Sequence, residues 1–206
     1  MNGKCFVFTN GSSLKKVLEL EKEVFFDQHV FTVNLFYETS YFFEIMPLNH
    51  IIADSGFWDP TTDDRILGIQ KRFKEQLLKV TWKMNLFVPS QGVPILEQKL
   101  KLNELITLVP YNMTPVSGYK KISHFFYRKN LGMPKPSNVL NAAIFLTLNL
   151  GYKTIYIYGA DHSWIQDLFV DEENDVCCYE NHFYDSTRKS YKLPKGSLAS
   201  GLKSIV

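Results

Sequence analysis

The sequence lacks several features that mark secreted, membrane-spanning or nucleic-acid-binding proteins. It has only three cysteines, an odd number, and Cys177 and Cys178 are adjacent, so we expect no disulfide framework. The longest apolar stretch, Ala142 to Leu150, contains two polar residues and is too short to cross a bilayer. No basic segment followed by a long apolar run opens the chain, so no signal peptide is expected. These absences predict a cytoplasmic protein without a transmembrane segment.

Charge is also sparse and nearly balanced. The 206 residues carry a net charge of +2, and the basic pairs Lys15-Lys16 and Lys120-Lys121 are isolated, which is typical of solvated surface positions. No nucleic-acid partner is expected, because such a partner requires a clustered basic surface. A hydrophobic content of 45% suffices for the core of one domain. We expect that domain over residues 1–191, followed by a tail over residues 192–206 that is either poorly ordered or the remnant of a longer chain.

Short apolar runs alternate with helical patterns along the chain, which predicts an α/β fold. Residues 111–137 carry several prolines and glycines and are expected to form a loop-rich insertion with one short helix. The predicted fold class is a Rossmann-like, mostly parallel sheet flanked by helices. The expected strands are 5–8, 29–34, 50–53, 85–88, 105–109 and 154–158, and the expected helices are 14–25, 36–46, 64–79, 120–127 and 138–150.

Polar side chains follow four of the expected strands. Asn10, Asn34, Asp54 and Asp161 each lie at a strand's carboxyl end. In an open parallel sheet, ligands bind in the crevice beyond these ends. Because carboxamides and carboxylates hydrogen-bond to sugar hydroxyls and base edges, the sequence predicts a nucleotide-type ligand at this edge of the sheet.

The first of these positions opens the loop Asn10-Gly11-Ser12-Ser13, which joins a strand to a helix. Such a loop presents backbone N–H groups to an anion, and Gly11 permits a ligand to approach closely. It has neither the spaced glycines of a dinucleotide fingerprint nor the Lys-Ser/Thr pair of a P-loop, which disfavours NAD and P-loop ATP chemistry. The alternative is a plain turn in which Ser12 or Ser13 caps the helix.

Two histidines lie in segments suited to proton transfer. His162 follows Asp161, and His182 is followed by the aromatic residues Phe183 and Tyr184. An imidazole titrates near neutral pH, so either ring is a candidate general base. The alternatives are an Asp161 helix cap with an exposed His162, and a His182 that is merely packed or on the surface.

Metal binding and thiol chemistry find less support in the pattern. Asp161, His162 and His182 could join the acidic segment 171–175 around a metal, but their spacing fixes no coordination geometry. We therefore expect that no metal cofactor is required. Nothing near Cys177-Cys178 in the sequence is placed to lower a thiol pKa, so these residues are expected to be buried rather than nucleophilic.

Three segments resemble the bacterial sialyltransferases of glycosyltransferase family 42 and the related Rossmann-type proteins similar to 6-hydroxymethylpterin diphosphokinase. Residues 6–15 (FVFTNGSSLK) resemble the family's opening strand and its Gly-Asn-Gly-Pro-Ser-Leu-Lys loop. Residues 33–37 (VNLFY) resemble a second-strand Asn followed by Gln-Phe-Tyr. Residues 148–161 (LNLGYKTIYIYGAD) resemble a Gly-Tyr-Lys segment that ends at the same distance in Gly-x-Asp.

The resemblance implies a glycosyltransferase that uses a CMP-type nucleotide sugar in bacterial surface polysaccharide synthesis. It places Asn10, Asn34 and Asp54 in the donor pocket and turns Gly159 and Asp161 toward the nucleotide. By the same likeness, Ser137 and Asn138 correspond to a Thr-Ser-Gly stretch that precedes a helix. In the implied mechanism His182 or His162 deprotonates the acceptor hydroxyl, while Tyr184 and the N–H groups near Ser12 and Ser13 stabilise the leaving phosphate.

Departures from the family keep other functions open. Thr9 and Ser12 replace a Gly and a Pro of the loop, Asp54 replaces an Asn, and Ser186 falls where the family has its catalytic His. One alternative is a diphosphokinase that needs magnesium and ATP, with the acidic segment or Asp54 and Asp161 holding the metal. Another is a non-catalytic nucleotide- or glycan-binding module. The expected partners are a nucleotide sugar and a glycan acceptor, with a homo-oligomeric assembly and room for peripheral membrane association.

Overall fold

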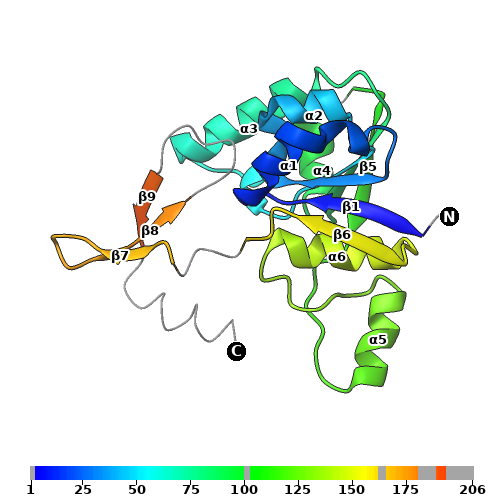
Figure 1. Cartoon of the computed structure of the whole chain (residues 1–206). Coiled ribbons are helices and arrows are strands. Elements are labelled where there is room, and N and C mark those ends of the chain that lie inside the picture. Colours follow the sequence, from blue (N-terminus) through cyan, green and yellow to red (C-terminus); the bar gives the residue numbers. More distant parts are fainter. Residues whose placement is uncertain (1–2, 100–102, 162–165, 181–188, 194–206) are drawn as a thin grey trace.

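The computed structural model describes residues 3–99, 103–161, 166–180 and 189–193 (Figure 1). Its centre is a six-stranded sheet in the order β5-β4-β3-β2-β1-β6, and every neighbouring pair is parallel. This confirms the predicted α/β class with a parallel sheet. The strands are β1 Lys4–Phe8, β2 Val30–Val33, β3 Asn49–Ile51, β4 Met84–Pro89, β5 Ile106–Tyr111 and β6 Thr154–Tyr158.

Helices connect the strands, largely where periodicity predicts them. The expected 36–46 helix is divided, because the extended backbone of Thr39 separates a 3-10 turn from a short α-helix. Helix α4 was not predicted, since it is short and has Pro94 in its first turn. Within the described ranges no helix is long and apolar enough to cross a membrane. The helices are α1 Ser13–Glu21, η1 Lys22–Phe25, η2 Asn34–Glu38, α2 Ser40–Ile45, η3 Ser55–Phe57, α3 Asp64–Leu77, α4 Val93–Lys99, α5 Lys120–Arg128 and α6 Val139–Asn149.

Two apolar cores lie on opposite faces of the sheet, which explains the continuous apolar run of β1. Phe6 and Phe8 pack with Leu14 and Leu18 of α1 in one core. The alternate side chains of the same strand pack with α6 in the other core. Figure 1 shows α1, α2 and α3 on one side of the sheet and α6 on the other. A strand buried on both faces needs apolar residues at every position rather than at every second one.

The edge strand β5 runs further than expected. The expected strand ended at Val109, directly before Pro110, but β5 continues to Tyr111, whose buried hydroxyl donates to the Ile52 carbonyl oxygen at 2.8 Å. Proline lacks an N–H group, and an edge strand tolerates it because one side of its backbone needs no strand partner. The prediction that the strand ends at Val109 was therefore wrong.

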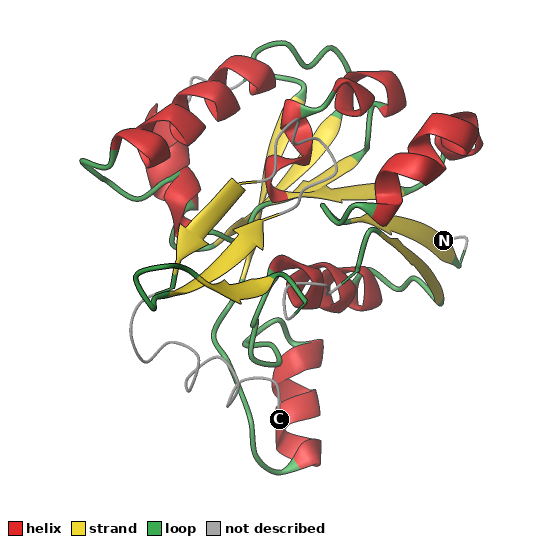
Figure 2. Cartoon of the chain, turned by 60° about the vertical axis from the view of Figure 1, so that its left-hand side comes forward, coloured by secondary structure: helices red, strands yellow, loops and turns green. Residues whose placement is uncertain are grey.

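A second, antiparallel sheet of three strands lies outside the main sheet (Figure 2). Its strands are β7 Leu168–Val170, β8 Val176–Glu180 and β9 Lys189–Lys192. The acidic segment 171–175 is the turn between β7 and β8. The tail was predicted to begin at Lys192, but that residue belongs to β9, and the N–H of Leu193 still bonds to Val176 at 2.8 Å.

His50 is fully buried beside the core that contains Phe6 and Phe8. Its Nδ1 lies 2.8 Å from the Thr32 hydroxyl of the neighbouring strand, and Phe42 and Tyr37 contact its ring edge-on. Burial lowers the pKa of His50 to about 3, because desolvation outweighs a favourable contact with the Asn34 backbone. The ring is therefore neutral in the folded chain at neutral pH.

This burial predicts acid sensitivity. The unfolded chain binds a proton at His50 near pH 6.5 and the folded chain only near pH 3, so unfolding takes up a proton between these values. The free energy of unfolding should fall, as pH drops below about 6.5, by at most ~1.4 kcal/mol per pH unit from this group. The double variant Thr32→Val/His50→Leu should lose this part of the slope in urea unfolding measured from pH 8 to pH 4.5. An unchanged slope would contradict the assignment.

Candidate functional site

A pocket of about 550 Å³ opens beyond the carboxyl ends of β1, β2, β3 and β6. We call it the strand-end pocket. The start of α6 and residues of the second sheet complete its wall. Eight of the ten predicted substrate-binding residues line it, and Ser12 and Ser13 do not. The pocket is lined by Thr9, Asn10, Gly11, Val33, Asn34, Ala53, Asp54, Met113, Pro136, Ser137, Asn138, Val139, Leu140, Gly159, Ala160, Asp161, Asp167, Cys178, Tyr179 and Tyr191.

The loops that follow β1 and β6 are joined directly beside this pocket. The N–H of Gly11 donates to the Gly159 carbonyl oxygen at 2.9 Å, and Thr9 donates through its N–H and its hydroxyl to Tyr158, each at 3.0 Å. A Cβ atom at Gly11 would lie 2.2 Å from that Gly159 oxygen and 2.8 Å from an Asp161 carboxylate oxygen. The contact therefore requires glycine at position 11.

Asp161 fills the place predicted for a ligand's phosphate. Its carboxylate accepts hydrogen bonds from the Ser12 hydroxyl at 3.0 Å, the Ser13 N–H at 2.8 Å and the Ser13 hydroxyl. The predicted capping of α1 by Ser12 or Ser13 is wrong, because Ser12 makes no side-chain cap bond and Asp161 caps the helix across 148 residues of sequence. A phosphate at this helix start would have to displace a carboxylate that the protein itself supplies.

The ionised form of Asp161 is favoured by these donors. Partial desolvation acts to raise the pKa of Asp161, but hydrogen bonds from Ser13 and Ser12 outweigh it and hold the pKa below its ordinary value. The carboxylate is thus charged at neutral pH. It also supplies the negative charge that the start of a helix favours.

Asn10 and Asn34 reach the pocket from neighbouring strands but differ in their bonding. Asn34 has a left-handed backbone with φ of 43°, and its amide oxygen accepts the Ala53 N–H at 3.1 Å, which ties β2 to the end of β3. The amide oxygen of Asn10 is buried and has no hydrogen-bond partner among the described residues. A buried acceptor without a partner costs about 1–3 kcal/mol, so a donor group on a ligand at Asn10 would be stabilised.

The start of α6 supplies a second polar wall. The side chain of Asn138 accepts the Asn141 N–H at 3.0 Å, as a capping residue does. The N–H groups of Val139 and Leu140 belong to the first turn, where an α-helix offers no internal acceptor. Asp54 is occupied differently, because its carboxylate accepts the Gly56 N–H at 2.8 Å and caps η3.

The second sheet brings pocket residues that the sequence did not single out. Asp167 is buried next to the start of β7, and its carbonyl oxygen accepts the Tyr179 N–H at 2.9 Å. Tyr179 and Tyr191 come from β8 and β9. The sequence does show that Asp167 precedes a short apolar segment. It does not show the strand pairing that places Asp167 at the pocket.

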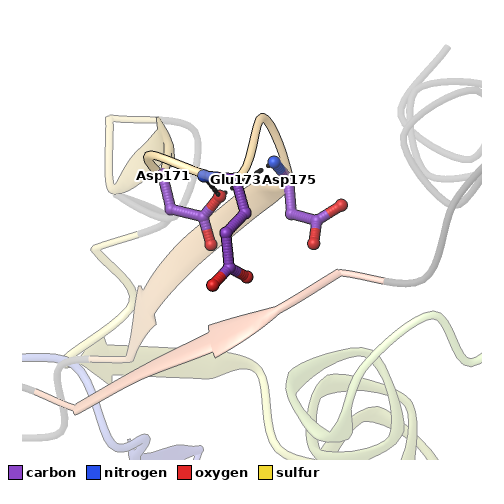
Figure 3. Close-up of side chains that lie close together, drawn as sticks. All are labelled: Asp171, Glu173 and Asp175. Atoms are coloured by element: carbon purple, nitrogen blue, oxygen red, sulfur yellow. Dashed lines mark hydrogen bonds between the residues drawn. The ribbon is translucent and has the colours of Figure 1, made fainter.

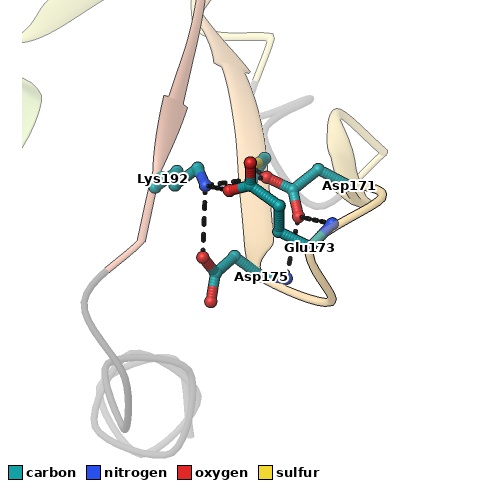
Figure 4. Close-up of polar contacts among 5 residues, drawn as sticks. Asp171, Glu173, Asp175 and Lys192 are labelled. Carbon is teal, nitrogen blue, oxygen red and sulfur yellow. Dashed lines mark hydrogen bonds and ion pairs between the residues drawn. The ribbon is translucent and has the colours of Figure 1, made fainter.

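The acidic turn is already paired with a cation of the protein itself. Carboxylate oxygens of Asp171, Glu173 and Asp175 lie within 4.8 Å of one another (Figure 3). The ammonium group of Lys192 lies among them, 3.2 Å from both aspartates and paired with Glu173 (Figure 4). These contacts raise the pKa of Lys192, so the lysine stays charged. The turn therefore does not fit a magnesium ion, because a cation would have to expel the lysine.

Thiol chemistry is equally disfavoured here. Desolvation, with a contact to Asp171, raises the pKa of Cys177, so its nucleophilic thiolate is scarce. Cys177 and Cys178 are both buried, as predicted.

The three predicted catalytic residues, His162, His182 and Tyr184, lie outside the described residues. Their roles remain predictions. The sequence matches no protein-family model and no curated protein.

The joined loops predict a steric effect at Gly11. Gly11→Ala should lower the free energy of unfolding by about 1–3 kcal/mol, because the added methyl group meets backbone and carboxylate atoms. Gly68→Ala in α3 is the matched control, since its Cβ would meet only the end of the Arg72 side chain at 3.2 Å. A helix interior gains ~0.5–1 kcal/mol from this change. Equal urea midpoints for the two variants would contradict the geometry of the joined loops.

Proposed function

We propose that the strand-end pocket binds the nucleotide part of a CMP-type nucleotide sugar and that the chain is a sialyltransferase-like glycosyltransferase. The observation that carries the proposal is the buried amide oxygen of Asn10, which lacks a partner in a pocket lined by seven more predicted substrate-binding residues. A base amino group or a ribose hydroxyl would supply the missing donor. The position beyond the strand ends is where parallel sheets hold nucleotides.

The phosphate is assigned to the start of α6 in this proposal. The Asp161 carboxylate already accepts hydrogen bonds from Ser12 and Ser13. The anion at the loop after β1 is therefore a side chain of the protein and not a ligand phosphate. The free N–H donors of Val139 and Leu140 and the positive end of the α6 dipole suit a phosphate there. This placement replaces the phosphate site predicted from the sequence.

The chemical step is proposed from the resemblance to the bacterial sialyltransferases. A His182 or His162 base and a Tyr184 donor would complete an inverting transfer to a glycan hydroxyl. Asp167, Tyr179 and Tyr191 border the pocket in the described part of the chain and are positioned to contact the sugar or the acceptor. The cytoplasmic location and the homo-oligomer stay predictions.

The proposal predicts selective stabilisation by a cytidine nucleotide. CMP or CDP at about 100 times its Kd should raise the melting temperature by roughly 5–10 °C without magnesium, because it binds only the folded chain. Asn10→Ala should weaken that binding about tenfold or more. The same substitution should leave the melting temperature of the free protein unchanged or raise it, because it removes an unpaired buried acceptor.

Asn149→Ala, at the far end of α6, is the control for general effects of losing a carboxamide. UDP, GDP and ATP with and without magnesium complete the screen. A shift that appears only with magnesium and ATP would favour the diphosphokinase. The absence of any nucleotide shift would reject the donor site and leave a glycan-binding module.

The phosphate placement has its own test in Val139→Pro. Proline fits the first position of a helix, and Asn138 before it already has the extended backbone that proline requires (φ −155°, ψ 171°). The variant deletes one N–H donor and should weaken CMP binding about tenfold while leaving cytidine binding unchanged. Val139→Ala keeps the N–H and controls for the lost side chain. Equal losses for CMP and cytidine in calorimetry would refute the assignment.

A further inference from the structure

One part of the chain carries basic residues and no acidic ones. Residues 105–160 contain no Asp or Glu. The whole chain has a net charge of only +2, so this segment differs sharply from the rest. By contrast, the surface helices α1 and α3 mix acidic and basic side chains. The basic residues of the segment are Lys120, Lys121, Arg128, Lys129, Lys135 and Lys153.

Helix α5 carries three of these six basic residues, with Lys129 directly after it, and stands off from the parallel sheet beyond α6 (Figures 1 and 2). Its inner side is anchored, because Ser123 is buried and the Tyr127 hydroxyl donates to the Val116 carbonyl oxygen at 2.6 Å. The Tyr127 ring also packs edge-on against Phe145 of α6, with centroids 5.9 Å apart. The helix is thus held firmly on one side and exposed on the other.

The outer side of α5 exposes large apolar side chains beside the basic ones. Ile122 and Phe125, three residues apart, are each 55% exposed. Tyr119 just before the helix is 84% exposed, and Leu131 just after it is 51% exposed. Lys120, His124 and Arg128 recur every four residues and so form a neighbouring stripe.

We propose that α5, with Tyr119 and Leu131, docks the protein on an anionic lipid bilayer. Apolar and aromatic side chains enter the boundary between headgroups and acyl chains, while adjacent lysines and arginines pair with anionic headgroups. The surface of α5 exposes both apolar and basic side chains, and it has no acidic residue that would repel the lipid charge. Because α5 is anchored by its opposite side, docking needs no change in the fold. This inference does not depend on the identity of the pocket's ligand.

The test is co-sedimentation of the whole chain with vesicles at low salt. Vesicles of phosphatidylcholine with about one third phosphatidylglycerol should bind the protein at least tenfold more tightly than phosphatidylcholine alone. Ile122→Ser/Phe125→Ser should weaken this binding about tenfold or more, and Lys120→Glu/Lys121→Glu should do the same. All four side chains are exposed, so circular dichroism should show an unchanged fold.

The matched controls are on α3 and its end, where Leu67→Ser/Leu78→Ser removes two exposed apolar side chains and Lys71→Glu/Lys74→Glu reverses two charges. These variants should bind vesicles as the original chain does. Absence of vesicle binding by the original chain would overturn the proposal, as would equal losses from the α3 variants. Binding that tracks the lysines but ignores Ile122 and Phe125, and that polyuridylic acid competes away, would indicate a polyanion site instead and would also overturn it.

Discussion

The contact between the loops after β1 and β6 organises the rest of the molecule. Gly11 and Gly159 meet through a backbone hydrogen bond, and Asp161 reaches past them to cap α1. This contact holds the last strand of the parallel sheet beside the first and fixes where α1 begins. Since α6 packs on the opposite face, the space left between α6 and these loops becomes the strand-end pocket.

The same contact decides which polar groups remain available to a ligand. Ser12 and Ser13 are occupied by Asp161, Asn34 holds Ala53, and Asp54 holds Gly56. The groups that remain available in the described pocket include the amide oxygen of Asn10 and the first-turn N–H groups of α6. One wall can therefore accept a hydrogen bond and another can donate to an anion. This separation suits a ligand with a base or sugar at one end and a phosphate at the other.

The sequence predicted the six parallel strands well. A strand that is buried on both faces consists of a short run of apolar residues, and such a run can be recognised from the local sequence alone. The sequence also predicted Asn10, Asn34 and Asp54 at one edge, since parallel strands bring their carboxyl ends together. It did not predict the second sheet, whose strands mix polar and apolar residues and pair through contacts made only in the folded chain. For the same reason it misplaced the phosphate, because nothing local indicates that Asp161 would reach Ser13. From the sequence, the acidic turn was also a possible metal site. The sequence does not show that β9 places Lys192 next to Asp171 and Asp175.

The pairing of β1 with β6 also governs when the protein can finish folding. The bonds that join these two strands span 149 residues of chain, so they close only after most of the sequence has been synthesised. Until then one edge of β1, an apolar strand, has no partner, and the start of α1 lacks its cap. Non-local pairing of this kind slows folding and prolongs the exposure of aggregation-prone strand edges. A nascent chain halted before residue 154 would thus present an incomplete sheet to the cell's chaperones, whatever ligand the finished pocket binds.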